Sequence, residues 1–92
     1  MAVYVDELIN NGWRLGHNCH LIADSIAELK EFAITHCKMR ESWFQPRSTP
    51  HFDLVSSRRT LAVRAGAIEL TRTDFVAKIR ELRERRNNGE FC

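Results

Sequence analysis

The stretch CHLIADSIAELKEFA, residues 19–33, passes from a strand pattern to a helix pattern with almost no loop between them. Its largely apolar start, residues 19–23, can form a strand. Asp24 and Ser25 then open a helix, because Ser25 and Glu28 have the spacing of a capping box. Along that helix, positions i, i+3, i+4 and i+7 predict one buried stripe formed by Leu29, Phe32, Ala33 and His36.

The segments on either side predict more strands of similar length. Residues 2–5, 51–55 and 67–70 are short and largely apolar, as strands of small sheets often are. Pro46 and Pro50 exclude a central strand where they stand, because proline cannot donate a ladder hydrogen bond. The segment 51–55 follows the second proline and can therefore still pair.

Two further helices are predicted from their ends. Ser56 or Ser57 can cap a helix that stops at Gly66, a residue suited to the left-handed conformation after a helix. Thr71 and Asp74 again have the capping spacing. The buried face of this last helix is predicted to consist of Phe75, Ile79 and Leu82.

The predicted order is β-β-α-β-α-β-α, which indicates an α/β fold with about four short strands and three helices packed on the sheet. Ninety-two residues are enough for one domain with a modest core. We place this domain at residues 1–86 and expect residues 87–92 to form a frayed tail. The hydrophobic fraction of 43% and the charged fraction of 28% are typical of globular proteins.

Composition also excludes several classes of protein. No apolar run approaches the roughly 20 residues that span a bilayer, so no membrane association is expected. The N-terminus carries acidic residues where a signal peptide needs basic ones. Three cysteines without regular spacing fit a reducing cytoplasm better than a disulfide framework. We therefore expect a cytoplasmic protein.

Charge is unevenly distributed along the chain. Residues 1–31 contain five acidic and two basic residues, whereas residues 32–92 contain twelve basic and seven acidic ones. The basic part could present a positive face to an anion. It could equally be a solvated helix surface, since Glu81 and Glu84 interrupt the basic run.

Three aspartates lie at or near the ends of predicted strands. Asp6 follows the first strand, Asp24 follows the second and Asp53 lies near the end of the third. If the strands run parallel, these carboxylates converge at one edge of the sheet, where Mg²⁺ or Mn²⁺ would bind and hold a phosphate. The structural alternative is that Asp24 caps a helix and Asp6 is a turn residue.

Two histidines lie near these acids. His20 precedes Asp24 by four residues, and His51 precedes Asp53 by two, on the same face of the predicted strand. A carboxylate orients an imidazole and favours its cationic form, which suits acid–base catalysis or an anion contact. The candidate catalytic residues are therefore His20, His51 and Asp53, and the alternative is that both histidines are structural.

Residues around the middle loop extend this candidate site. Arg58 and Arg59 fall in the first turn of a helix, where the free N–H groups already favour an anion. Gln45 follows Trp43 and Phe44 and can donate a directed hydrogen bond from an aromatic wall. The candidate ligand-binding residues are His20, Trp43, Gln45, His51, Asp53 and Arg58.

A zinc site is disfavoured. The segment HNCH (17–20) offers His17, Cys19 and His20, and His36 and Cys37 follow later. Structural zinc sites normally pair such ligands at regular short spacings, and none is present here.

Five ordered motifs resemble those of a known family, and together they extend over residues 2 to about 82: VYVDEL, CHLIAD, WFQ, HFDL and SRRTLAVRAGAIEL. In this respect the chain is similar to the domain-of-unknown-function 4031 family, small proteins of bacteria and their phages to which no activity is assigned. The resemblance implies family positions at Asp6, His20, Asp24, Trp43, Phe44, Gln45, His51, Asp53, Arg58 and Gly66.

The chain departs from the pattern of that family at two places. Phe52 stands where such proteins often have tyrosine, so a phenol at this position is not required here. His36 and Cys37 stand where a glycine often ends the first helix, which puts that boundary in question.

Three functions are compatible with these residues. The first is a binding module for an anionic ligand, either a nucleotide or a nucleic-acid phosphate, with Trp43 stacking on a base. The second is a protein-interaction factor, acting on a host protein or on a second copy of the chain. The third is a phosphoesterase or nuclease that depends on a divalent metal.

Overall fold

The computed structural model describes residues 2–9, 17–46 and 49–89. Within these ranges the elements follow the predicted order, with one 3-10 turn added before the third strand. Their bounds are β1 (Val3–Val5), β2 (Asn18–Ala23), α1 (Ile26–Cys37), η1 (Glu41–Trp43), β3 (Phe52–Val55), α2 (Ser56–Arg64), β4 (Ile68–Glu69) and α3 (Arg72–Asn87). The end of the predicted tail, residues 90–92, lies outside the described residues.

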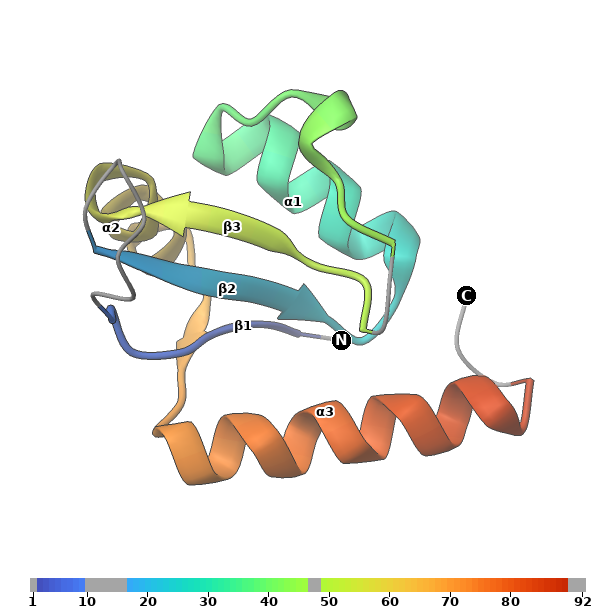
Figure 1. The fold of residues 1–92 in the computed structure, drawn as a ribbon. Coiled ribbons are helices and arrows are strands. Elements are labelled where there is room, and N and C mark those ends of the chain that lie inside the picture. Colours follow the sequence, from blue (N-terminus) through green and yellow to red (C-terminus); the bar gives the residue numbers. More distant parts are fainter. Residues whose placement is uncertain (1, 10–16, 47–48, 90–92) are drawn as a thin grey trace.

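The strands of the described ranges form one mixed sheet in the order β3-β2-β1-β4 (Figure 1). β2 is antiparallel to both β1 and β3, whereas β4 is parallel to β1. The register pairs Val5 with Leu21 and His20 with Asp53. Because β2 runs against its neighbours, the end of β1 and the start of β3 both lie beside Leu21, near the middle of β2.

Strand alternation separates the side chains into two layers. On one face, α1 and α2 cover the larger core cluster, whose fully buried members include Val5, Leu21, Leu29, Phe52 and Leu54. Each such side chain stabilises the fold by roughly 1.5–3 kcal/mol through removal from water. The fold is therefore a sheet with two helices on one side.

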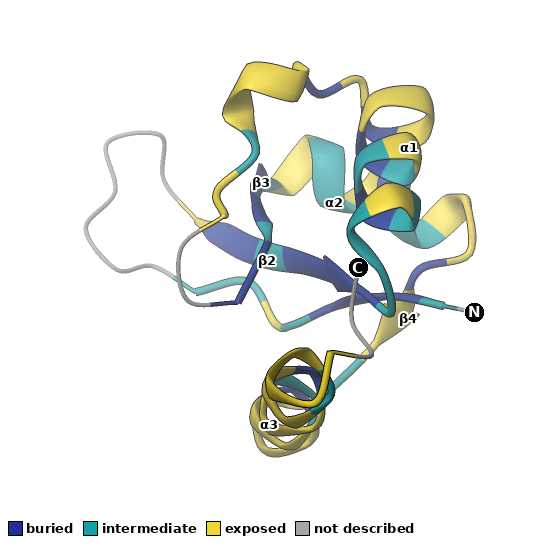
Figure 2. Cartoon of the chain, turned by 90° about the vertical axis from the view of Figure 1, so that its right-hand side faces the viewer, coloured by how far each residue is buried: buried dark blue, intermediate teal, exposed yellow. Residues whose placement is uncertain are grey.

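The third helix, α3, lies across the other face of the sheet (Figure 2). It contributes Phe75 and Leu82 to a second cluster with Tyr4 of β1 and Ile22 of β2. Among the described residues, no member of this cluster comes from β3. The β3 side of this face is consequently less covered, and Asp53 there is half-buried.

The helix caps predicted from the sequence are present. The hydroxyl of Ser25 accepts the N–H of Glu28 at 3.2 Å, and that of Thr71 accepts the N–H of Asp74 at 3.2 Å. At its C-terminus, α1 ends on Lys38, which adopts the left-handed conformation with φ 57° and ψ 37°. A lysine thus takes the position that glycine usually favours.

One predicted core position in α1 is wrong. His36 is exposed, and the buried residues of the helix are Leu29, Ala33 and Cys37. These three residues are spaced at i, i+4 and i+8 and form the row of α1 that faces the sheet. His36 lies next to this row and not in it, so its side chain is exposed. The helix ends at Cys37, at the place where the resemblance puts an end, although Lys38 and not a glycine follows it.

The loop after α1 folds back on the start of β3. Gln45 and His51 form an antiparallel bridge, with N–H to carbonyl distances of 2.9 and 3.0 Å in the two directions. Phe44 packs its ring 5.6 Å from that of Phe52, which anchors the loop to the core. The backbone of His51 is thereby fixed at the edge of the sheet.

Among the helices of the described ranges, none combines the length and the apolar character needed to cross a bilayer.

Candidate functional site

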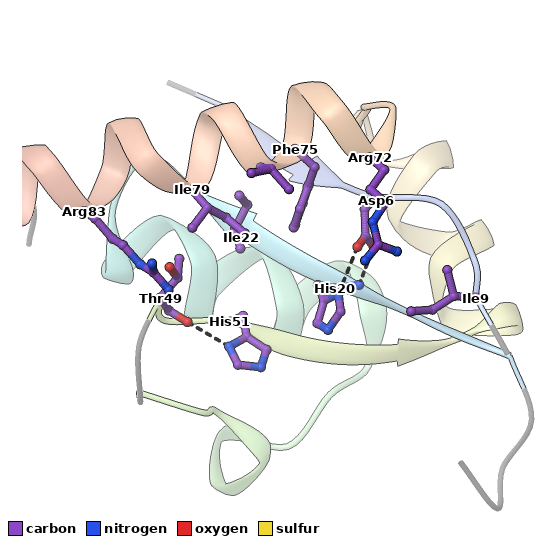
Figure 3. Close-up of a pocket in the computed structure, with 11 residues that line it drawn as sticks. Asp6, Ile9, His20, Ile22, Thr49, His51, Arg72, Phe75, Ile79 and Arg83 are labelled. Carbon is purple, nitrogen blue, oxygen red and sulfur yellow. Dashed lines mark hydrogen bonds and ion pairs between the residues drawn. The ribbon is translucent and has the colours of Figure 1, made fainter. Parts of the chain in front are cut away.

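A pocket of about 270 Å³ lies between α3 and the sheet face that α3 covers (Figure 3). Its volume is close to the lower end of the range of about 300–1,000 Å³ for small-molecule sites. The sheet side and its loops contribute Asp6, Ile9, His20, Ile22, Thr49 and His51. The helix side contributes Arg72, Phe75, Val76, Ile79 and Arg83.

Asp6 holds His20 at two points. Its Oδ1 accepts the backbone N–H of His20 at 2.7 Å, and its Oδ2 lies 2.9 Å from Nδ1 of the imidazole. The backbone carbonyl of Asp6 accepts a hydrogen bond from Nε of Arg59 at 3.0 Å, which ties the end of β1 to α2. The Asp6 side chain is only 14% exposed, so the pair is partly shielded from water.

These contacts make His20 more basic. The pKa of its imidazole is raised from the ordinary value of 6.5, chiefly because of the hydrogen bond to Asp6. Burial lowers the pKa, the charges of Asp6 and Asp53 raise it, and the charge of Arg72 lowers it. A raised pKa increases the fraction of His20 that is cationic near neutral pH.

His51 is oriented by the loop that precedes it. Its Nδ1 lies 2.7 Å from the backbone carbonyl of Thr49. Because a carbonyl only accepts, Nδ1 must carry the proton in this contact. The His51 ring centroid lies 5.6 Å from that of His20, and the two rings meet edge to face at an interplanar angle of 67°.

Asp53 joins the two imidazoles. Its Oδ1 lies 3.8 Å from Nε2 of His20 and 3.6 Å from Nε2 of His51. Its Oδ2 accepts a hydrogen bond from the side-chain amide of Gln45. The structure therefore brings together Gln45, His51, Asp53 and His20, four of the predicted ligand-binding residues.

Thr49 brings a hydroxyl to the same pocket. The residue is 6% exposed, and its Oγ1 has no hydrogen-bond partner among the described residues. An unsatisfied buried polar atom costs about 1–3 kcal/mol. A polar ligand in the pocket could satisfy this hydroxyl.

Two arginines of α3 lie at the ends of the pocket. Figure 3 shows Arg72 near Asp6 and Arg83 near Thr49, with Ile79 and Phe75 between them. The N-terminus of α3 is held in place by Glu7, whose Oε2 accepts the backbone N–H of Arg72 at 3.2 Å.

The three predicted metal ligands do not converge on one site: Asp6 and Asp53 both lie beside His20, but Asp24 does not. Antiparallel pairing of β1 and β2 puts Asp24 at the opposite end of the sheet from Asp6. There Asp24 accepts the N–H of Ala2 at 2.9 Å and the hydroxyl of Tyr4 at 3.1 Å. The predicted convergence of Asp6, Asp24 and Asp53 required that the first three strands run parallel. In the structure, β2 is antiparallel to both β1 and β3. Among the described residues, no group of three His, Cys, Asp or Glu side chains is arranged to hold a metal ion.

Arg58 and Trp43 lie outside the pocket. Arg58 donates hydrogen bonds to the carbonyls of Cys37 and Lys38, at 3.0 and 2.8 Å, and so closes the C-terminal end of α1. Its guanidinium carbon lies 5.4 Å from the Trp43 ring, and that of Arg40 lies 5.6 Å from it. These residues form a separate basic and aromatic group.

Among the described residues, the thiols of Cys19 and Cys37 lie in the core and do not line the pocket. Cys19 faces the core with α1 and α2, whereas its neighbour His20 faces α3. Burial raises the pKa of Cys19 to about 12 and that of Cys37 to about 11. Thiols of this kind remain protonated, and metals bind the thiolate.

Sequence reasoning did not find Thr49, and it considered Arg72 and Arg83 only as members of the basic stretch of the last helix, not as residues of the site. For the arginines a signal was present, because Arg72, Phe75, Ile79 and Arg83 follow helical spacing and share one face of α3. For Thr49 no comparable signal exists, since only the bridge between Gln45 and His51 turns it toward the pocket.

Comparison with known proteins gives one match. The family model "Protein of unknown function (DUF4031)" matches residues 3–82. Neither the curated proteins nor the solved structures contain a match. Because the family model extends over most of the 92 residues, the chain belongs to the DUF4031 family of proteins of unknown function.

Proposed function

We propose that this chain is a binding module whose pocket holds the phosphate of a nucleotide or of a nucleic acid. The observation that carries the proposal is the charge of the lining. Arg72, Arg83 and a readily protonated His20 face one pocket, and Asp6, the carboxylate that lines it, is already engaged by His20. Phosphate oxygens are strong acceptors for such charged donors.

The uncharged part of the pocket lining, a hydroxyl and several apolar side chains, also fits a nucleotide. The hydroxyl of Thr49 lines the pocket without a partner among the described residues, and a phosphate oxygen can accept its proton. The apolar side chains of Ile22, Phe75 and Ile79 line the remainder of the pocket. Few directed polar groups on an apolar lining are typical of small-molecule sites.

We propose that the protein acts in the cytoplasm of a bacterial cell. Its gene could belong to the bacterium or to a phage that infects it. Cys19 and Cys37 are both free and buried, which agrees with a reducing compartment.

Amide NMR spectra of the isotope-labelled protein, recorded during titration with inorganic phosphate and then with nucleoside monophosphates, test this proposal. We expect shifts concentrated at His20, Thr49, His51 and Arg72. The variant Thr49→Val should weaken binding at least about fivefold, because it removes the hydroxyl that lines the pocket without a partner among the described residues. Arg64→Gln removes an exposed charge from α2, outside the pocket, and should leave the affinity unchanged.

Two outcomes would contradict the proposal. Shifts spread over the exposed arginines, without change at His20 or Thr49, would indicate diffuse charge attraction. The absence of any shift at millimolar phosphate and nucleotide would exclude an anion site in this pocket.

A further inference from the structure

The pocket is elongated along α3, with a positive charge at each end. Arg72 and Arg83 both line it and are eleven residues apart on one helix. At about 1.5 Å of rise per residue, their Cα atoms lie about 16 Å apart along the helix axis. Their side chains lie at opposite ends of the pocket, Arg72 near Asp6 and Arg83 near Thr49 (Figure 3), so one phosphate group does not contact both as they lie.

The middle of the pocket is apolar. Phe75 and Ile79 lie on the helix side and Ile22 on the opposite side (Figure 3). Val76 of the same helix also lines the pocket and is 42% exposed, so its side chain is accessible to a ligand. A ligand that matches this pattern carries anionic groups at intervals and flat, apolar faces between them.

We propose that the ligand is a short single strand of nucleic acid lying along α3, with phosphates near Arg72 and Arg83 and a base against the exposed side chain of Val76. This rests on the proposed function and narrows it to one class of ligand. Phosphates follow one another about every 3.4 Å of axis even in a compact B-form strand, so a few nucleotides extend over the distance between the arginines. An exposed apolar side chain such as Val76 can pack against the flat face of any base, so this contact does not select a sequence.

A duplex does not fit the same pocket. Its bases are stacked and paired inside, so they cannot contact the apolar lining.

The remainder of α3 is consistent with a polyanion. The helix carries six basic and three acidic residues over Arg72–Asn87. This excess attracts nucleic acid from a distance without selecting a sequence. Specific contact is assigned to the two arginines that line the pocket, and general attraction to the others.

Fluorescence anisotropy with labelled hexamers of thymidine and of uridine tests the inference, at several salt concentrations and against unlabelled mononucleotide. We expect the hexamers to bind at least about tenfold more tightly than thymidine or uridine monophosphate. Arg72→Gln and Arg83→Gln should each weaken hexamer binding at least about threefold. Each should also lower the slope of log affinity against log salt by about 0.7, the value for one phosphate contact to a single strand.

Arg80→Gln is the matched control. Arg80 lies on the same helix, carries the same charge and does not line the pocket. Its replacement should change hexamer affinity by less than about twofold, and circular dichroism would verify that all three variants are folded.

Three results would overturn the inference. If a mononucleotide binds as tightly as a hexamer, the ligand is a free nucleotide and the proposed function survives alone. If Arg80→Gln weakens binding as much as Arg83→Gln, or a duplex competes as well as a hexamer, the attraction is diffuse. If neither hexamer nor mononucleotide binds, the proposed function fails as well.

Discussion

At the scale of single residues, His20 is the side chain that joins the sheet strands at the pocket. Its Nδ1 contacts Asp6 of the β1 end, and its Nε2 lies near Asp53 of β3. Both carboxylates favour its cationic form. The same charge that links the strands is the one that we expect to contact a phosphate.

Asp6→Asn should lower the pKa of His20, because the replaced carboxylate is the largest cause of its elevation. The free energy of unfolding at pH 6 should fall by about 1–2 kcal/mol, since a partly buried charged hydrogen bond is lost. Two-dimensional NMR of the imidazole, recorded as a function of pH, measures the pKa directly. Glu31→Gln removes an exposed acid from α1 and serves as the control. An unchanged pKa of His20 in Asp6→Asn would contradict this account.

The affinity for phosphate should depend on pH through His20. Its folded pKa is raised above 6.5, so its charged form contributes fully below that pH. The contribution is lost as the pH rises through the folded pKa. The charged or titratable groups around the ring are Asp6, Asp53, His51 and Arg72.

We therefore expect phosphate affinity to fall as the pH is raised from about 6 to about 9. The stability of the fold should fall over the same window, by less than about 1 kcal/mol, because the side chain is 36% exposed and screened by water. Calorimetric titration with sulfate, a phosphate mimic whose charge is constant over this window, measures the first effect, and urea denaturation the second. A sulfate affinity that increased with pH would exclude His20 as a contact.

At the scale of elements, the C-terminal end of α1 contains a strained backbone conformation. Lys38 adopts φ 57°, and among the described residues it is the one position other than glycine with a positive φ. The left-handed conformation costs an L-residue roughly 1–2 kcal/mol. Arg58 compensates by donating to the carbonyls of Cys37 and Lys38, so α2 stabilises the terminus of α1.

Lys38→Gly should raise the free energy of unfolding by about 0.5–1 kcal/mol, because glycine adopts this conformation without strain. Thermal denaturation followed by circular dichroism measures the change. Lys38→Ala removes the side chain and keeps the strain, so it should have little effect. Equal stabilisation by both variants would attribute the gain to loss of the lysine side chain and not to the backbone.

At the scale of the whole molecule, the pocket exists only because α3 packs on the far face of the sheet. A small cluster holds it there, in which Phe75 and Leu82 of the helix contact Tyr4 and Ile22 of the strands. This cluster is much smaller than the core under α1 and α2. The helix wall of the pocket therefore depends on few apolar contacts.

Leu82→Ala should lower the free energy of unfolding by about 2–4 kcal/mol, because Leu82 is 2% exposed and its truncation leaves a cavity. It should also weaken phosphate binding, although Leu82 does not line the pocket, since it positions α3. Urea denaturation and the phosphate titration measure the two effects. Ile34→Ala, at an exposed site of α1, is the control. Loss of stability without loss of binding would show that the pocket does not require a firmly docked α3.

The sequence by itself determined the order of the elements. Strand alternation, helical spacing and the caps at Ser25 and Thr71 are local signals that act between residues close in the chain, and all of them appear in the structure. The proximity of His51 to Asp53 is local in the same sense. The buried row of α1 was mispredicted at His36, because the exact face that meets the sheet depends on how the helix is rotated.

Only the tertiary structure decided the direction of the strands and the position of the last helix. Because β1 and β2 pair antiparallel, Asp6 lies within hydrogen-bond distance of His20, whereas Asp24 lies at the other end of the sheet. The packing of α3 brought Arg72 and Arg83 to the pocket. Both depend on contacts between residues far apart in sequence, whose free energy belongs to the packed core and cannot be assigned to any single segment.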